Sequence, residues 1–152
     1  MRFLFLSFFF LTACHFQPLY VDKSIHQVCV APISEASGFQ IYQALVQHFP
    51  NKENCLYTLT VHPPKTTLSD ENISDKDFIT MQRITTATSY TLLDKNKKVL
   101  FENSVSSSGS SAVVSNPYAT VMAEEKTAQN LYSIVAEQIA LHVAAFLHRN
   151  SP

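Results

Sequence analysis

Residues 78–105 read FITMQRITTATSYTLLDKNKKVLFENSV and carry the clearest secondary-structure signal of the chain. Residues 78–93 are rich in Thr, Ile and Tyr and contain no glycine, which favours a long strand. A bulge is expected in it, because its apolar residues change face after Met81. A polar turn follows at 94–97, and then Val99, Phe101 and Val105 line a partner strand. The stretch therefore predicts an antiparallel hairpin.

Two short strands and a helix are expected before this hairpin. The sequence QVCVAPI at 27–33 alternates around Cys29 and predicts a strand that Pro32 ends. Apolar residues at spacings of three and four predict a helix over 38–49, capped by Ser34 or Ser37. The sequence CLYTLTVH at 55–62 predicts a second strand, with one face made by Cys55, Tyr57, Leu59 and Val61. The two strands should be parallel.

Two polar segments and a long helix complete the expected fold. Residues 65–77 are polar and acidic and read as a mobile connection, and residues 106–117 read as a small-residue loop. A helix is expected over 118–148, with Pro117 near its first turn and an apolar face of Val121, Ala128, Leu131, Val135, Ile139, Val143 and Phe146. The order strand, helix, strand, strand, strand, helix predicts an α+β fold, with two helices packed on one face of a four-stranded mixed sheet.

The N-terminus has the pattern of an export signal. Arg2 precedes an apolar run at 3–11 that holds five of the eleven phenylalanines, and the small residues Thr12 and Ala13 follow. Nine apolar residues are too few for a membrane-spanning helix, which needs about 20. This predicts a signal peptide over 1–13, a tether over 14–26, a single domain over 27–148 and a tail over 149–152.

The signal ends in a motif that points to lipid attachment. Leu11-Thr12-Ala13-Cys14 resembles the lipobox of bacterial lipoproteins, in which a peptidase cuts before the cysteine and that residue carries the lipid. Cys14 is therefore the expected lipidation site, and the alternative is an ordinary signal with an incidental cysteine. His15 stands where an aspartate often retains such lipoproteins in the inner membrane, which favours the outer membrane.

Cys29 and Cys55 remain as an even pair in a compartment that permits disulfides. One hypothesis is a bridge between two adjacent strands. The other is a pair of buried free thiols, since cysteine packs well as a small hydrophobic residue.

The sequence offers no motif for catalysis, metal or cofactor. Two glycines in 152 residues argue against Gly-rich phosphate loops, and G-x-S-x-G, H-E-x-x-H and C-x-x-C are all absent. The six histidines lie far apart, and the acidic stretch with Asp70, Glu71, Asp75 and Asp77 lacks the glycine and terminal glutamate of a calcium loop. Without Arg2 the chain has ten basic and twelve acidic residues, which does not suit nucleic acid. A non-enzymatic protein is expected, and a small envelope hydrolase is disfavoured.

The basic residues suggest two places for anion binding. Arg83 lies in a strand otherwise made of Thr, Ile, Ala and Tyr, so it must face solvent or meet an anionic partner such as phosphate or carboxylate. Lys95, Lys97 and Lys98 form a cluster at the hairpin turn. These three lysines either protect an exposed strand edge and aid solubility, or they bind a ligand.

Four features together resemble the LPS-assembly lipoprotein family (LptE). They are LTAC followed by His15-Phe16-Gln17-Pro18-Leu19, Arg83 seven residues before Tyr90, Asn116-Pro117 opening into Tyr118-Ala119, and a long last helix with Ala128, Gln138 and Ile139. The resemblance implies an outer-membrane lipoprotein on the periplasmic side. It also implies a role as the plug of the LPS-translocating barrel (LptD), assisting barrel assembly and contacting lipopolysaccharide.

The resemblance also implies which residues contact lipopolysaccharide. Arg83 is the position implied to meet lipid A phosphates. The family uses a lysine near the start of the last helix, where this chain has Ala123, with Lys126 three residues later. Because Ala123 replaces that lysine, the implied contact with lipopolysaccharide would come from Lys126 or from Lys95, Lys97 and Lys98. The alternative function is a regulatory or accessory lipoprotein of an envelope enzyme or a lipid transporter.

Overall fold

The computed structural model describes residues 25–50, 53–73 and 79–150. The expected signal peptide, Cys14, most of the tether and the acidic residues Asp75 and Asp77 lie outside these ranges. The elements are a 3-10 turn η1 (Ile25–Gln27), β1 (Val28–Val30), α1 (Ala36–His48), β2 (Tyr57–Val61), β3 (Lys65–Ile73), β4 (Ile79–Asp94), β5 (Val99–Ala112) and α2 (Pro117–Asn150). Ile25, assigned to the tether from sequence, is buried in the core, and α2 continues two residues past position 148.

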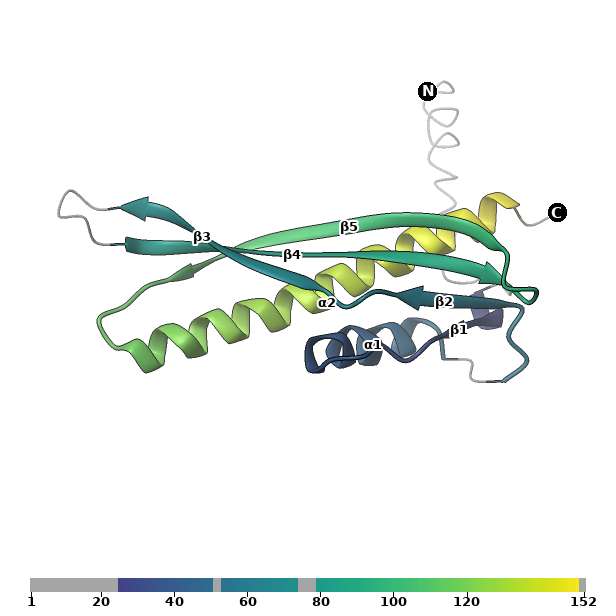
Figure 1. Ribbon diagram of the computed structural model, residues 1–152, viewed down its shortest axis with the longest axis horizontal. Coiled ribbons are helices and arrows are strands. Elements are labelled where there is room, and N and C mark those ends of the chain that lie inside the picture. Colours follow the sequence, from purple (N-terminus) through teal and green to yellow (C-terminus); the bar gives the residue numbers. More distant parts are fainter. Residues whose placement is uncertain (1–24, 51–52, 74–78, 151–152) are drawn as a thin grey trace, which may run out of the picture.

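The α+β prediction is confirmed. Both helices lie on the same side of a mixed sheet (Figure 1). The first two strands, β1 and β2, are parallel as expected, and all other pairs are antiparallel. Strand β4 is the centre of the sheet, because β5 pairs along one of its edges while β2 and then β3 pair along the other.

The sheet has five strands rather than four, because 65–73 is a strand and not the predicted loop. Residues Lys65 to Ile73 pair with Ala87 to Ile79 of β4, directly after β2 pairs with Asp94 to Tyr90. Residues 62–64 interrupt this edge, since Pro63 and Pro64 lack an N–H group. At the break the His62 N–H donates to the Ser89 carbonyl at 2.9 Å, and Thr88 Oγ1 donates to the His62 carbonyl at 2.6 Å. β2 and β3 therefore pair one after the other along the same edge of β4, with a break between them.

The predicted loop over 106–117 was also wrong for its first part. Strand β5 continues to Ala112, which pairs with Met81, and its small residues from Ser106 to Ser111 pair one by one with Ala87 to Gln82 of β4. At α1 the expected serine cap was wrong as well. The cap residue is Glu35, with φ of 79° and no side-chain hydrogen bond to the helix. A Cβ at Gly38 would overlap Ile33 Cγ2, so close packing there requires a glycine.

The core lies between the sheet and the helices. Helix α2 buries Leu131, Val135, Ile139 and Val143 as predicted, together with Ala136, Ala140, Ala144 and Leu147. Val121 was predicted to lie on this face but is 57% exposed, and Phe39 of α1 is 55% exposed. Helix α2 is long and apolar enough to span a membrane by composition, yet it packs on the sheet as a core helix.

Tyr90 of β4 is the largest fully buried side chain. Its hydroxyl oxygen lies 2.8 Å from His142 Nδ1 of α2, and its ring makes an edge contact with Phe101 of β5 at a centroid distance of 6.0 Å. Burial disfavours the phenolate and raises the pKa of Tyr90 from 10.0 to about 12. The hydroxyl therefore stays neutral in the folded chain and links the sheet to α2.

This shift makes folding pH-dependent in alkali. The unfolded chain loses the Tyr90 proton near pH 10 and the folded chain only near pH 12, so the stability that Tyr90 contributes is complete below pH 10. That contribution should fall as the pH rises from about 10 to 12. Urea unfolding of the wild type and of Tyr90→Phe across this range measures it, because the variant retains every other titrating group. Parallel stability curves for the two proteins would contradict the expected loss.

Candidate functional site

The candidate site is the face of the sheet that points away from the helices, which we call the open face. Along β4 the buried residues Ile84, Thr86, Thr88, Tyr90 and Leu92 alternate with less buried ones that point the other way. No described helix covers this second side (Figure 1). The open face is made by Arg83, Thr85, Ala87, Ser89 and Thr91 of β4, Ser104, Ser106, Ser108 and Ser110 of β5, and Lys65, Thr67 and Ser69 of β3.

Hydroxyl groups dominate the open face. Register pairs such as Thr85 and Ser108 place two hydroxyls side by side across neighbouring strands, and their oxygens lie 2.9 Å apart. Thr67 Oγ1 donates to the Thr85 carbonyl at 3.5 Å from the other edge. Three adjacent strands therefore present a largely polar surface that is rich in hydroxyl groups.

Arg83 lies at one end of this face and has a partner within the chain. Its Nη2 forms an ion pair with Glu71 Oε1 of β3, and Ser110 Oγ of β5 donates to Glu71 Oε2 at 2.6 Å. The hydroxyl of Ser110, followed by the guanidinium of Arg83, holds the pKa of Glu71 below its ordinary value. Arg83 meets both sequence alternatives, because its side chain is 53% exposed to solvent and also has an anionic partner, a carboxylate of the same chain.

Glu71 and Ser110 were not recognised as site residues from the sequence. Glu71 belongs to a polar, acidic stretch whose composition predicts a mobile connection, and Ser110 belongs to a run of serines without an individual signal. Only the pairing of β3 and β5 with opposite edges of β4 brings them to Arg83.

The other predicted basic residues lie elsewhere. Lys95, Lys97 and Lys98 are exposed at the turn between β4 and β5, twelve or more residues along from Arg83, or about 40 Å at the usual strand rise. Lys126 is exposed on α2, beside Met122 and Gln129 and on the helical side of the sheet. The structure therefore does not gather the five basic residues into one site.

The lysine turn is built by Asp94. Its Oδ1 accepts the backbone N–H groups of Asn96 at 2.7 Å and Lys98 at 2.9 Å, and Lys97 has φ of 62°. The Lys98 N–H is the main reason that the pKa of Asp94 lies below its ordinary value. The turn therefore presents its three lysines from a defined backbone.

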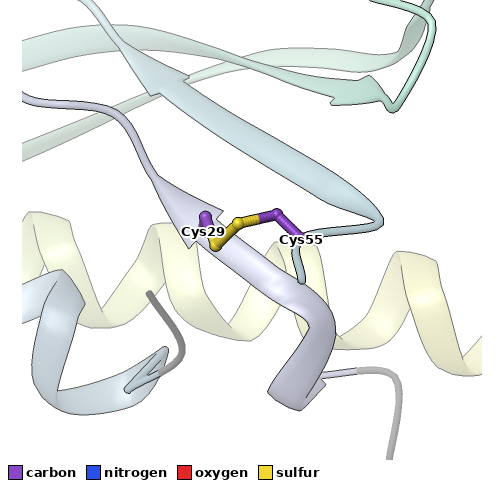
Figure 2. Close-up of a disulfide and its surroundings, with 2 residues drawn as sticks. All are labelled: Cys29 and Cys55. Carbon is purple, nitrogen blue, oxygen red and sulfur yellow. A yellow bond between two sulfur atoms is a disulfide. The ribbon is translucent and has the colours of Figure 1, made fainter. Parts of the chain in front are cut away.

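Cys29 and Cys55 form a disulfide, which is the bonded form of the two sequence alternatives (Figure 2). Cys29 lies in β1, and Cys55 lies two residues before β2, with 5.6 Å between their Cα atoms. The bond ties the short parallel strand β1 to the rest of the sheet.

Residues that could hold a metal are not grouped in the described part of the chain. Within residues 25–50, 53–73 and 79–150, no three His, Cys, Asp or Glu side chains come together for that purpose. A pocket of about 820 Å³ opens at the break between β2 and β3 and is lined by Pro63, Pro64, Ser89 and Ser104 among others. It lies next to the open face.

Several solved bacterial lipoproteins share this fold. A candidate lipoprotein from Caulobacter crescentus has a TM-score of 0.64 at 15% identity, covering 82% of this chain and 93% of that chain. Rare lipoprotein B from Shewanella oneidensis has a TM-score of 0.63 at 10% identity, with coverages of 78% and 94%. A minor lipoprotein from Acinetobacter baumannii has 0.62 at 12% identity, with 79% and 92%.

At these identities the likeness shows the fold alone. The chain thus has the fold of rare lipoprotein B along nearly the full length of the solved domains. No protein-family model and no curated protein matches the sequence.

Proposed function

We propose that the chain is an outer-membrane lipoprotein that partners and plugs the LPS-translocating β-barrel, an LptD-like protein, and assists barrel assembly and lipopolysaccharide insertion. In this proposal Cys14 carries the lipid, the domain lies on the periplasmic side, and the chain catalyses no reaction. The lipobox and the fold shared with bacterial lipoproteins support the anchor. The open face is the observation that carries the partnership.

The open face has the chemistry that a barrel interior requires. The lumen of a membrane barrel is polar, so a plug must present polar groups to it without a large apolar patch. Ser and Thr of β3, β4 and β5 supply donors and acceptors over the length of two long strands, and the charge of Arg83 is neutralised by Glu71. The helices bury the opposite side of the sheet, which leaves the open face for the barrel wall.

Lipopolysaccharide contacts are proposed at separate points. Arg83 is the phosphate-binding residue of the open face, because a guanidinium donates two parallel hydrogen bonds to an oxyanion. Lys95, Lys97 and Lys98 at the turn and Lys126 on α2 supply further positive charge at a distance from Arg83. These residues would act on different parts of a large anionic glycolipid or on a membrane surface, rather than as one pocket.

Site-specific photocrosslinking in the native envelope tests the partnership. A photoreactive residue at Thr85, in the middle of the open face, should give an adduct with a large outer-membrane barrel protein. The matched control is position 134 of α2, where Ile134 is 43% exposed on the helical side. Its barrel adduct should be several-fold weaker. Equal labelling from both positions would contradict docking through the open face, and an adduct with an inner-membrane or cell-wall enzyme would support the accessory-lipoprotein alternative.

A further inference from the structure

A β-bulge directs the carboxylate of Glu71 toward Arg83. Asp70 pairs with Gln82 and Asn72 pairs with Met81, so Glu71 is the extra residue between two neighbouring positions of β4. Bulges re-aim a side chain and are frequent beside functional sites. Here the bulge on β3 lets one carboxylate bond to Arg83 of β4 and to Ser110 of β5, one oxygen to each.

Arg83 and Ser110 provide the donor set of an oxyanion site. They are register partners on neighbouring strands, and both point to the open face. A guanidinium and a hydroxyl that together hold the two oxygens of a carboxylate can also hold two oxygens of a phosphate, which carries more charge. The carboxylate of Glu71 stands where such a ligand would bind.

We infer that Arg83 and Ser110 form a phosphate site that Glu71 occupies from within the chain, and that Glu71 competes with an incoming phosphate group. The competition itself follows from the contacts of Glu71. The identity of the ligand, the phosphate of an anionic glycolipid, rests on the proposed function.

The internal occupant can be displaced. Arg83 is 53% exposed and Glu71 is 25% exposed, and ion pairs in such positions are weak and screened by salt. A phosphate dianion offers Arg83 a stronger partner than a single carboxylate does. An incoming anion must therefore bind more strongly than the Glu71 carboxylate does, which favours phosphate over weaker anions at this position.

The test is a titration of the full-length chain in detergent micelles with inorganic phosphate, followed by NMR at the Arg83 side chain and the Ser110 amide. Glu71→Gln keeps the side-chain size and removes the charge, and it should bind phosphate on the order of two- to fivefold more tightly, as the strength of exposed ion pairs allows. Arg83→Ala should abolish the response in both backgrounds.

Asp70→Asn is the matched control. It removes the same charge one residue away, where the carboxylate accepts from Gln82 Nε2 at 3.4 Å instead of from Arg83. Its phosphate affinity should stay close to that of the wild type. Equal affinities for Glu71→Gln and Asp70→Asn would overturn the competition, because net charge alone would then explain any change.

The same variants titrated with lipopolysaccharide separate this inference from the proposed function. If Glu71→Gln binds both phosphate and lipopolysaccharide more tightly, both stand. If it binds only phosphate more tightly, the competition stands and the proposed lipopolysaccharide contact at Arg83 is wrong. If Arg83→Ala weakens lipopolysaccharide binding but Glu71→Gln changes neither affinity, the proposed contact stands and the competition is wrong.

Discussion

Ile139→Ala should lower the free energy of unfolding by about 2 to 5 kcal/mol, the usual range for truncating a buried isoleucine. Ile139 has no exposed surface and lies in the cluster that joins α2 to Leu45 of α1 and to Leu59 and Tyr90 of the sheet. The loss has two parts, the transfer free energy of the removed methylenes and the cavity that remains. Urea unfolding of the wild type and the variant measures it.

Ile134→Ala is the matched control on the same helix. It makes the same chemical change five residues earlier, at a side chain that is 43% exposed. Because this exposed side chain buries less apolar surface on folding, the loss in the free energy of unfolding should stay below about 1 kcal/mol. Similar losses for the two variants would contradict the assignment of the buried face of α2.

Loss of the Cys29–Cys55 disulfide should lower the free energy of unfolding by about 3 to 4 kcal/mol. The bond closes a loop between residues 26 positions apart, and the chain-entropy estimate for a loop of that size lies in this range. The strand it holds, β1, has only three residues and pairs with a single neighbour. Urea unfolding with and without reductant measures the loss.

A double variant, Cys29→Ala with Cys55→Ala, makes the experiment specific. It should unfold at the lower urea concentration of the reduced wild type and should not respond to reductant. Two free thiols at these positions in unreduced protein, together with unchanged unfolding on reduction, would contradict the disulfide.

The elements that the sequence predicts correctly are those whose pattern is local. The hairpin of β4 and β5 and the buried stripe of α2 from Leu131 to Val143 follow from alternation, turn residues and helical spacing. The parallel pairing of β1 and β2 follows from the helix between them. None of these depends on knowing which distant segment lies alongside.

The elements that the sequence misses depend on a distant partner. Residues 65–73 and 106–112 contain Ser, Asp, Glu and Asn, which have low strand propensity, so each reads alone as a loop. The length of β4 makes them strands, because its backbone groups on both edges need partners along its whole course. Their polar residues are tolerated because one of their faces is open to solvent.

The candidate site was predictable only in part for the same reason. Arg83 is conspicuous as a lone cation among β-branched residues. Its partners Glu71 and Ser110 lie 12 and 27 positions away in the sequence, and a bulge without a sequence signature aims Glu71 at it. The lysines of the turn and Lys126 of α2 are linked to Arg83 only through the implied ligand, which says nothing about the distance between them.

The most direct test of the account is a gentle detergent extraction of the full-length lipoprotein from its own envelope, followed by mass identification of the proteins that remain bound. The account predicts a stoichiometric outer-membrane barrel protein, retained by the wild type and lost when the open face is altered at Thr85. Recovery of an inner-membrane complex or a cell-wall enzyme in place of the barrel would contradict it.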